Sequence, residues 1–268
     1  METWDFPDRL VGRRVMHHTV LLSTNDLAAT LATTPANSGT VILADEQTAG
    51  RGQYGRRWLA PPGSSVLMSI LLFPPRELCR PAILTAWAAV SVGETILQLT
   101  GRQAKIKWPN DVLLHGKKVC GILIEQAAGT VIGIGLNVNQ SAEDFERAGL
   151  PLAGSLAAAT GRSFNHMAVA HALIEKLNAE YDLLLSGERT TLEACWKWRF
   201  GLLGRDVRAE CADGTTHRGR LTELTFQGIQ LEQPGGTVMT LVPETVRSLN
   251  SVQCSVFSDE RNVIATDY

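Results

Sequence analysis

Four short strand-like runs with turn signals between them constrain the fold of this chain most strongly. The runs are residues 105–108, 112–114, 118–125 and 130–136. Two of the gaps between them hold His115-Gly116 and Ala128-Gly129. Short β runs separated by glycine-containing pairs are typical of hairpins, so the middle of the chain is predicted to fold as β-hairpins.

Helical patterns surround this β region. Residues 81–99 predict a helix, with Pro81 near the start and Gly101 just past the end. A second helix is predicted by a one-sided apolar stripe with helical spacing, Ala170, Leu173, Ile174, Leu177, Tyr181 and Leu184. Residues 188–199 predict a third. Earlier in the chain, strands are expected at 15–22, 40–44 and 64–73, and a helix at 26–33.

The pattern of apolar runs and turns changes after Gly201. Residues 202–249 alternate short β runs with glycine turns at 213–214, 227–228 and 235–236, which predicts a small barrel. A chain of 268 residues is long for one domain, since about 150 residues per domain is typical. We therefore expect a first domain at 1–201, a second at 202–249 and a polar tail at 250–268.

Composition excludes several classes of protein. A formal net charge of −2 argues against general electrostatic binding of nucleic acid. The N-terminus does not have the pattern of a signal peptide, and the uncharged stretch 81–93 is too short to span a bilayer. The five cysteines lie far apart without a CxxC pair, which argues against disulfides and zinc and favours the reducing cytoplasm.

The strongest chemical signal is the segment 50–58, GRGQYGRRW. It holds three glycines and three arginines in nine residues. Glycine lets a backbone approach a ligand closely, backbone N–H groups can form an anion-binding nest, and arginine binds phosphate or carboxylate. The segment matches neither GxGxxG nor GxxxxGK[ST], so it predicts neither an ordinary dinucleotide loop nor a P-loop. On its own, a solvated basic turn remains the alternative.

Two further segments carry polar residues beside β runs. The first is KWPND at 107–111, followed by KKVCGILIE at 117–125. The second is GIGLNVN at 133–139. Strand ends commonly hold ligand groups. The alternatives are a Pro-Asn-Asp turn with surface lysines for the first, and an asparagine turn at a strand end for the second.

Taken together, these segments resemble the biotin protein ligase family. The matching pieces are Ser23-Thr24-Asn25, Gln47 with the 50–58 loop, 107–111, 117–125 and 133–139. Their order and spacing match along residues 20–140, and a weaker likeness extends to about 249. The resemblance implies an α+β fold, with a mixed β-sheet flanked by helices of the class II synthetase-like, biotin/lipoate ligase type, and a small C-terminal SH3-like β-barrel.

The resemblance also implies a two-step reaction. The biotin carboxylate attacks the α-phosphorus of ATP, giving biotinyl-5′-adenylate and pyrophosphate. A lysine of a biotin carboxyl carrier protein of a biotin-dependent carboxylase then attacks the mixed anhydride, giving an amide and AMP. The implied cofactors are ATP and Mg²⁺, with biotin as substrate. A homodimer is one implied assembly, and no DNA or membrane partner is expected.

By resemblance, the catalytic residues are Lys118, Arg51 and Asp111, with Asp111 either near Mg²⁺ or accepting a proton. The implied biotin-binding residues are Ser23, Thr24, Asn25, Gln47, Gly50, Arg51, Gly52, Gln53 and Lys118. The implied nucleotide-binding residues are Arg51, Trp58, Lys107, Asn110, Asp111 and Asn137. Trp58 and Trp108 could wall the pocket, although a core position is the commoner place for a tryptophan.

Two departures from the family pattern matter. Many relatives have arginine where this chain has Gln53, so either Arg51, Arg56 or Arg57 compensates or the adenylate is released more readily. Only 22 residues precede Ser23, too few for a winged helix, which predicts no repressor role. The alternative functions are a lipoate or octanoate ligase or transferase of the same fold, and a non-catalytic biotin-binding module. A pure binder would not need Arg51, Lys118 and Asp111.

Overall fold

The computed structural model describes residues 1–252 of the chain. Its strands are β1 Glu2–Asp5, β2 Arg14–Leu21, β3 Thr40–Gln47, β4 Ser65–Leu72, β5 Lys105–Lys107, β6 Asp111–Leu114, β7 Lys117–Gln126, β8 Thr130–Asn137, β9 Asp206–Cys211, β10 Thr216–Leu224, β11 Ile229–Glu232, β12 Val238–Leu241 and β13 Val246–Ser251. Its α-helices are α1 Thr24–Leu31, α2 Pro81–Thr100, α3 Ala142–Arg147, α4 Leu156–Thr160, α5 His166–Leu185 and α6 Arg189–Phe200. All the strands and helices predicted before residue 201 are present within a few residues of their predicted bounds. The structure adds β1, α3 and α4, which no pattern had indicated.

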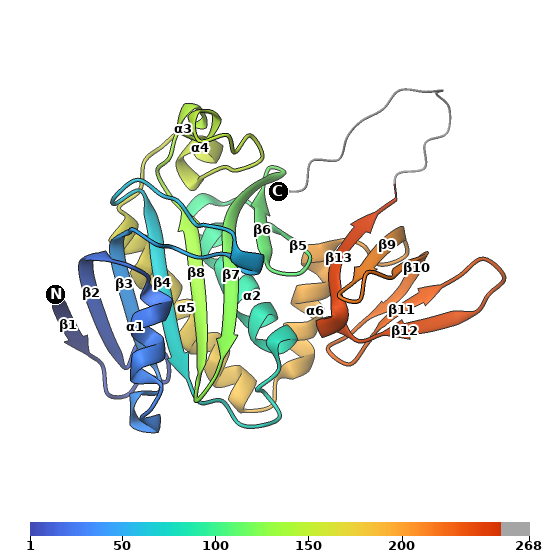
Figure 1. Cartoon of the computed structure of the whole chain (residues 1–268), viewed down its shortest axis with the longest axis horizontal. Coiled ribbons are helices and arrows are strands. Elements are labelled where there is room, and N and C mark those ends of the chain that lie inside the picture. Colours follow the sequence, from blue (N-terminus) through green and yellow to red (C-terminus); the bar gives the residue numbers. More distant parts are fainter. Residues whose placement is uncertain (253–268) are drawn as a thin grey trace.

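The first 200 residues build an eight-stranded sheet in the order β1-β2-β3-β4-β8-β7-β6-β5 (Figure 1). Strands β5 to β8 are joined by antiparallel pairing, which confirms the predicted hairpins. Only β2 and β3 run parallel in this sheet, and α1 supplies the crossover that a parallel pair requires. The predicted mixed sheet with flanking helices is therefore confirmed.

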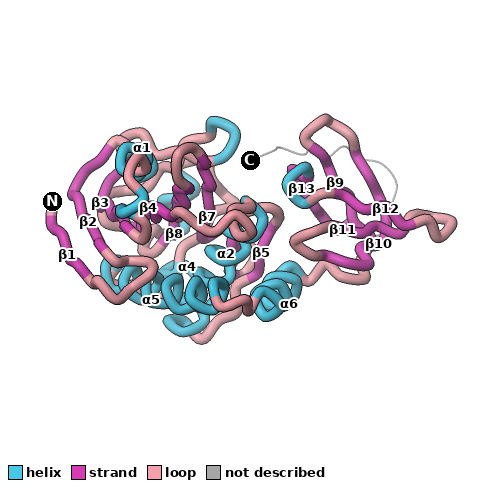
Figure 2. The backbone as a smooth tube through the Cα atoms, turned by 90° about the horizontal axis from the view of Figure 1, so that it is seen from below, coloured by secondary structure: helices cyan, strands magenta, loops and turns pink. Residues whose placement is uncertain are grey.

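Helices cover the two faces of the sheet unequally. Figure 2 shows α5 and α6 along one side of the sheet and α1 on the other. The main core forms between the sheet, α2 and α5, where the predicted apolar stripe of α5 is buried from Ala170 to Leu184. A smaller apolar cluster, which includes Ala28 and Val131, lies under α1. The α1 face is therefore left largely open for a site.

Helix α2 is the central helix of this core. Its 20 residues are long and apolar enough to cross a membrane, but 67% of its most apolar window is buried inside the protein. Trp87 is fully buried, and its indole N–H donates to the carbonyl of Leu177 at 3.2 Å. These contacts are those of a core helix, because the apolar surface of α2 already packs against protein.

A carboxylate between two histidines ties α5 to the sheet. Asp45 Oδ1 on β3 contacts His17 Nε2 at 2.9 Å and His166 Nε2 at 3.1 Å. Burial by itself raises the pKa of Asp45, but the hydrogen bonds from the two histidines outweigh it and hold this pKa below its usual range. These histidines therefore have a structural role. No group of three or more metal-ligating side chains that could hold a metal ion occurs within residues 1–252.

Residues after 201 form a second sheet of five antiparallel strands in the order β12-β11-β10-β9-β13. In the described part of the chain, no ladder of hydrogen bonds joins the outer strands β12 and β13, so the closed barrel remains a prediction. Strand β13 continues to Ser251, two residues past the predicted end of the second domain. The rest of the predicted tail, 253–268, lies outside the described residues, as does Cys254.

Aromatic side chains join the two sheets around α6. Trp108 is buried against Trp196 and Phe200, and its indole N–H donates to the carbonyl of Val246 on β13 at 2.7 Å. Arg80 adds a two-pronged ion pair with Glu244, with a shortest contact of 2.8 Å. Trp108 is therefore a core residue that holds the second sheet in place, and it does not wall the pocket.

Candidate active site

A cavity of about 520 Å³ opens on the face of the sheet that carries α1. Residues far apart in the sequence meet around it, from α1, the 50–58 loop, strands β6 to β8 and the segment 145–153. Every predicted site residue except Gly50 lines this cavity, namely Ser23, Thr24, Asn25, Gln47, Arg51, Gly52, Gln53, Trp58, Lys107, Asn110, Asp111, Lys118 and Asn137. The structure therefore brings the motifs together in one place.

The 50–58 loop folds as a short hairpin over the cavity. Arg51 and Arg57 pair as an antiparallel bridge, and the N–H of Gly52 donates to the carbonyl of Arg56 at 2.7 Å. At the tip, Tyr54 and Gly55 have positive φ values of 57° and 76°. Glycine adopts such values without strain, so Gly55 lets the chain reverse here. The hairpin presents its arginine side chains around the mouth of the cavity.

A hydrogen-bond network arranges the neutral polar residues at one end of the cavity. Gln47 Oε1 accepts from the backbone N–H of Thr24 at 2.7 Å and from its hydroxyl at 3.1 Å. The fully buried Ser69 hydroxyl lies within reach of Thr24 Oγ1 and Asn25 Oδ1, and its single proton serves one of them at a time. Ser23 lies at the N-cap of α1 but makes no capping hydrogen bond through its side chain. These groups can therefore face an uncharged polar ligand.

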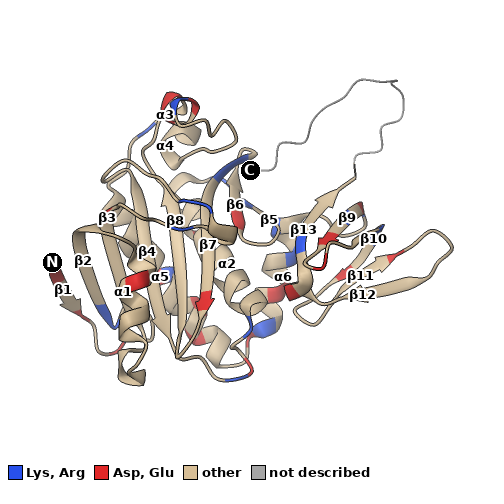
Figure 3. Ribbon diagram, in the orientation of Figure 1, with Lys and Arg blue, Asp and Glu red and all other residues tan. Residues whose placement is uncertain are grey.

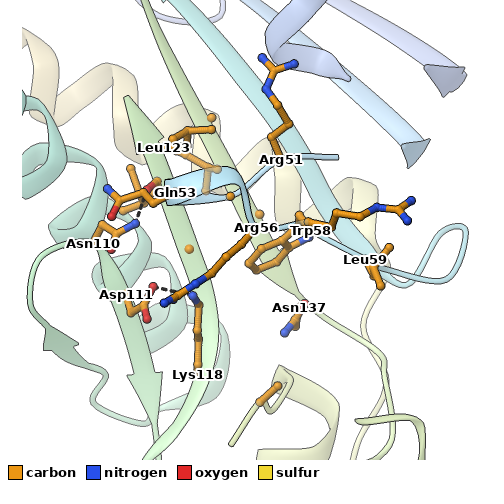
Figure 4. A pocket seen from close by; sticks show the side chains of 18 of the residues that line it. Arg51, Gln53, Arg56, Trp58, Leu59, Asn110, Asp111, Lys118, Leu123 and Asn137 are labelled. Carbon is orange, nitrogen blue, oxygen red and sulfur yellow. Dashed lines mark hydrogen bonds and ion pairs between the residues drawn. The ribbon is translucent and has the colours of Figure 1, made fainter. Parts of the chain in front are cut away.

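Lys118 and Asp111 form an ion pair at the other end. The ammonium lies 2.7 Å from Asp111 Oδ1, and the two side chains are 37% and 20% exposed (Figure 4). The ammonium thus pairs with the buried oxygen of this carboxylate. The pairing of β6 with β7 shifts register next to Lys118, which is typical of a bulge that redirects a side chain.

Glycines on β7 and β8 make room for two of the site side chains. Gly121 and Gly135 are cross-strand partners, and the Trp58 indole lies against both. A Cβ atom at Gly135 would stand 2.5 Å from the indole, and one at Gly133 would stand 2.5 Å from Asn25 Oδ1. The glycines of the 133–139 segment are therefore needed for close packing of the site, beyond a simple strand-end turn.

Positive charge dominates the lining of the cavity. Asp111 is its one acidic residue, and the basic residues are Arg51, Arg56, Arg57, Lys107 and Lys118. Figure 3 shows the basic segments on the 50–58 loop and at the start of β7, around the acidic position on β6. Such a cavity attracts anions, and its low-dielectric walls strengthen the attraction.

The arginines of the loop point in different directions. Arg51 binds Asp26 on α1 and Glu125 on β7, which turns it away from the Lys118–Asp111 pair (Figure 4). The hydrogen bond with Asp26 raises the pKa of Arg51, against the lowering effect of burial. Arg56 extends into the cavity toward the Lys118–Asp111 end in the same view. Of the two, Arg56 therefore lies better placed to meet an anion there.

The two asparagines of the predicted site hold its walls. Asn110 Nδ2 donates to the carbonyl of Ile122 at 2.6 Å. Asn137 Nδ2 donates to the carbonyl of Gly154 at 3.0 Å, and its Oδ1 accepts from Gln140 at 3.1 Å. Each amide already has a partner in the protein, so a direct contact of either with a nucleotide remains a prediction.

Sequence reasoning missed an apolar wall of the cavity. Its members are Leu59, Phe145, Leu150, Leu152 and Ala153. Two backbone hydrogen bonds dock the segment 145–153 beside β7. The N–H of Lys118 donates to the carbonyl of Leu152, and the N–H of Gly154 donates to the carbonyl of Lys118, both at 2.8 Å. Residues 145–153 have no regular apolar period, so no signal in the sequence could have placed them at the site.

Known proteins of one family are similar to this chain. Residues 18–139 match the Biotin/lipoate A/B protein ligase family. The Bifunctional ligase/repressor BirA of Bacillus subtilis (strain 168) is 35% identical over 228 residues, which cover 83% of this chain and 70% of that protein. The chain belongs to the biotin protein ligases of this family. The Biotin–[acetyl-CoA-carboxylase] ligase of Mycobacterium tuberculosis is 31% identical to this ligase over 234 residues, covering 84% of this chain and 85% of the relative.

A solved structure has a similar fold. The biotin protein ligase from Aquifex aeolicus in complex with biotin and ATP superimposes with a TM-score of 0.74 and 25% sequence identity. The match covers 89% of this chain and 99% of the other. This ligase therefore shares the fold of that structure over most of its length.

Proposed function

We propose that this ligase activates biotin with ATP as biotinyl-5′-AMP and transfers it to a lysine of a biotin carboxyl carrier protein. The observation that carries the proposal is the Lys118–Asp111 pair in a cationic cavity that also holds neutral polar groups and an apolar wall. The names of the relatives support it, since one is a Biotin–[acetyl-CoA-carboxylase] ligase and a similar structure holds biotin and ATP.

The charges of the cavity suit the first step. A carboxylate oxygen of biotin attacks the α-phosphorus of ATP, the bond to the β-phosphate breaks, and pyrophosphate leaves. Two unit negative charges 4 Å apart repel by about 4 kcal/mol at an effective dielectric near 20. Lys118 and Arg56 lie where they can offset this repulsion, and fixed cations stabilise the charge that develops on the phosphoryl oxygens. Lys107 and Arg57 add to the same field.

The neutral end of the cavity suits biotin. Its ureido ring is uncharged and needs donors and acceptors within an apolar site. We assign Ser23, Thr24, Asn25 and Gln47 to this ring, because they gather at one end of the cavity. Gln47 has its carbonyl oxygen bound by Thr24, which leaves its amide N–H groups for a ligand.

The apolar wall suits a planar base. Leu152 is 59% exposed and Leu150 is 36% exposed, although both are large apolar side chains that line the cavity. We assign these residues, with Phe145 and Trp58, to the adenine side of ATP, where the base would cover them. This assignment places the α-phosphate between the wall and the biotin end, near Lys118.

Mg²⁺ fits this site through a single protein carboxylate. Asp111 is the one acidic residue that lines the cavity, and its carboxylate, 20% exposed, offers the oxygen donors that Mg²⁺ prefers. Mg²⁺ is commonly held by one or two carboxylates together with substrate phosphates and water. Asp111 would hold the ion, which when bound would neutralise part of the phosphate charge.

In the second step the lysine amine of the carrier attacks the carbonyl of the anhydride, AMP leaves, and the nitrogen loses a proton. Asp111 is the candidate acceptor for that proton if it does not hold metal. Gly50, Gly52 and Gln53 would lie along the adenylate as parts of the hairpin. We also propose that the second domain, residues 202–249, is an SH3-like barrel. We further propose that the protein is cytoplasmic and does not bind DNA.

Biotin-dependent ATP–pyrophosphate exchange, followed by transfer to a purified carrier domain, tests the proposal. We expect Lys118→Ala to lower the exchange rate by about 10²–10³-fold with biotin binding largely kept, which is the usual cost of removing a charge-stabilising donor. Lys105 is the matched control, since it is an exposed strand lysine outside the lining of the cavity. Exchange with lipoate or octanoate in place of biotin would refute the choice of substrate, and an unaffected rate in Lys118→Ala would refute the role of that residue.

A further inference from the structure

We propose that Glu125 is a positioning residue that joins the biotin end of the cavity to the 50–58 loop. The inference rests on the proposed function and names a residue of the same site. Glu125 lies near the end of β7 and does not line the cavity. Its carboxylate stands between α1 and the loop, two elements that both carry predicted binding residues.

The contacts of Glu125 connect these two elements directly. Its Oε2 accepts from Asn25 Nδ2 at 2.6 Å. Its two oxygens also accept from Arg51 Nη2 at 3.2 Å and 3.1 Å. Arg51 Nη1 donates to Asp26 on α1. We call Arg51, Asp26 and Glu125 the loop anchor, because together they fix the base of the hairpin to α1 and β7.

The charge of the loop anchor explains what Arg51 does. One guanidinium between two carboxylates carries a net charge of −1, which does not attract a phosphate. The guanidinium also points away from the Lys118–Asp111 pair (Figure 4). In this arrangement Arg51 holds the hairpin, and the attraction of phosphate falls to Lys118 and Arg56. The side chain of Arg51 thus acts through the position of the loop.

Glu125 also decides which way the Asn25 amide faces. A carboxylate only accepts hydrogen bonds, so it selects the amide nitrogen of Asn25 and directs the carbonyl oxygen toward Ser69. The absence of a side chain at Gly133 leaves the space that this orientation needs. Without the carboxylate, the amide could rotate and present the wrong group. Asp26 still holds Arg51 and the loop when Glu125 is changed, so the loss should fall on biotin rather than on ATP.

The test is a comparison of Michaelis constants in biotin-dependent ATP–pyrophosphate exchange. Glu125→Gln keeps the size of the side chain and removes its charge. We expect this variant to raise the KM for biotin about tenfold, because hydrogen bonds to charged groups are stronger than neutral ones. The KM for ATP should change by less than about twofold. Glu232→Gln, an exposed glutamate at the end of β11, is the matched control and should match the unmodified protein.

A double-variant cycle checks the link to the loop. If Arg51 acts through the loop anchor, Arg51→Lys with Glu125→Gln should be about as impaired as the worse single variant, because coupled residues do not act additively. Losses that multiply would overturn the inference, as would a Glu125→Gln variant whose two KM values and kcat all change together, which indicates a loosened fold. An inactive unmodified protein would refute the proposed function, whereas an active protein with an unchanged Glu125→Gln variant would refute this inference alone.

Discussion

Replacing Gly135 by alanine tests whether Trp58 shapes the ligand cavity. The added Cβ would stand 2.5, 2.6 and 2.9 Å from three atoms of the indole, where ordinary contact begins at 3.4 Å. The ring must therefore shift by about 3.4 − 2.5 ≈ 0.9 Å. Trp58 is half-buried and borders the cavity, so the ring has room to move on that side. The strain falls mainly on the ligand space.

We expect a small effect on folding and a larger one on binding. Overpacking of a full core costs about 1–3 kcal/mol, and the open side of the ring puts Gly135→Ala at the low end of that range. A displaced indole would occupy space that the ligand needs, and we expect binding to weaken by about 10–100-fold, or about 1.4–2.8 kcal/mol. Gly121→Ala should be milder, because a single indole atom lies within 3.0 Å of its added Cβ, at 2.9 Å.

The measurements are calorimetric titration of biotin and ATP together with urea unfolding of each variant. The control is Gly135→Ala in a Trp58→Ala background, where the methyl group has no ring to displace. The additional loss caused by Gly135→Ala should then disappear. Unchanged affinity in the single variant, or an equal loss without the indole, would refute the steric argument.

Three further predictions concern charge and stability. Burial raises the pKa of Asp45, but the hydrogen bonds from two histidines outweigh it and hold this pKa below its ordinary 3.8. The ionised carboxylate therefore stabilises the fold above about pH 4, and this stabilisation is lost as the pH falls through the lowered pKa. Asp45→Asn should therefore lower the free energy of unfolding by about 1–3 kcal/mol at pH 6, and a deficit that does not shrink as the pH is lowered below about 4 would contradict the reasoning. If Gln53 lets the adenylate leave the site more readily, the unmodified protein should release more free biotinyl-adenylate and label itself more than Gln53→Arg. Equal release and equal self-labelling would refute this hypothesis. Arg199 is 3% exposed and pairs with Glu94, so Arg199→Met should cost about 3 kcal/mol in urea unfolding without changing exchange kinetics, and a cost below about 1 kcal/mol would show that the pair matters little.

Local patterns identified most of the secondary structure. The apolar stripe of α5 and the proline and glycine that bound α2 are signals within a few residues of each other, and such signals act before tertiary contacts form. Helices α3 and α4 are only six and five residues long, so they present too little periodicity to be recognised. Strand β1 depends on pairing with β2, which its four residues do not indicate by themselves.

Some residues of the site could likewise be identified from local sequence signals, and others only from tertiary contacts. The residue types of the 50–58, 107–111 and 117–125 segments indicated an anion-binding site, because arginine, lysine and glycine have that chemistry wherever they lie. Ser69 gave no such signal, since a serine in a buried strand resembles any other small core residue. Its role depends on the register of β4 and on the placement of α1, which bring it to Thr24 and Asn25.

The sequence alone indicated the family, the chemistry of the loop and the positions of most strands along the chain, because these follow from residue type and short-range periodicity. Tertiary structure alone decided that Arg51 turns to Asp26 and Glu125, that Trp58 lies on Gly121 and Gly135, and that residues 145–153 form an apolar wall. The physical reason is that each of these contacts joins residues distant in the chain. Strand register and packing select such partners, and neither can be read from a short stretch of sequence.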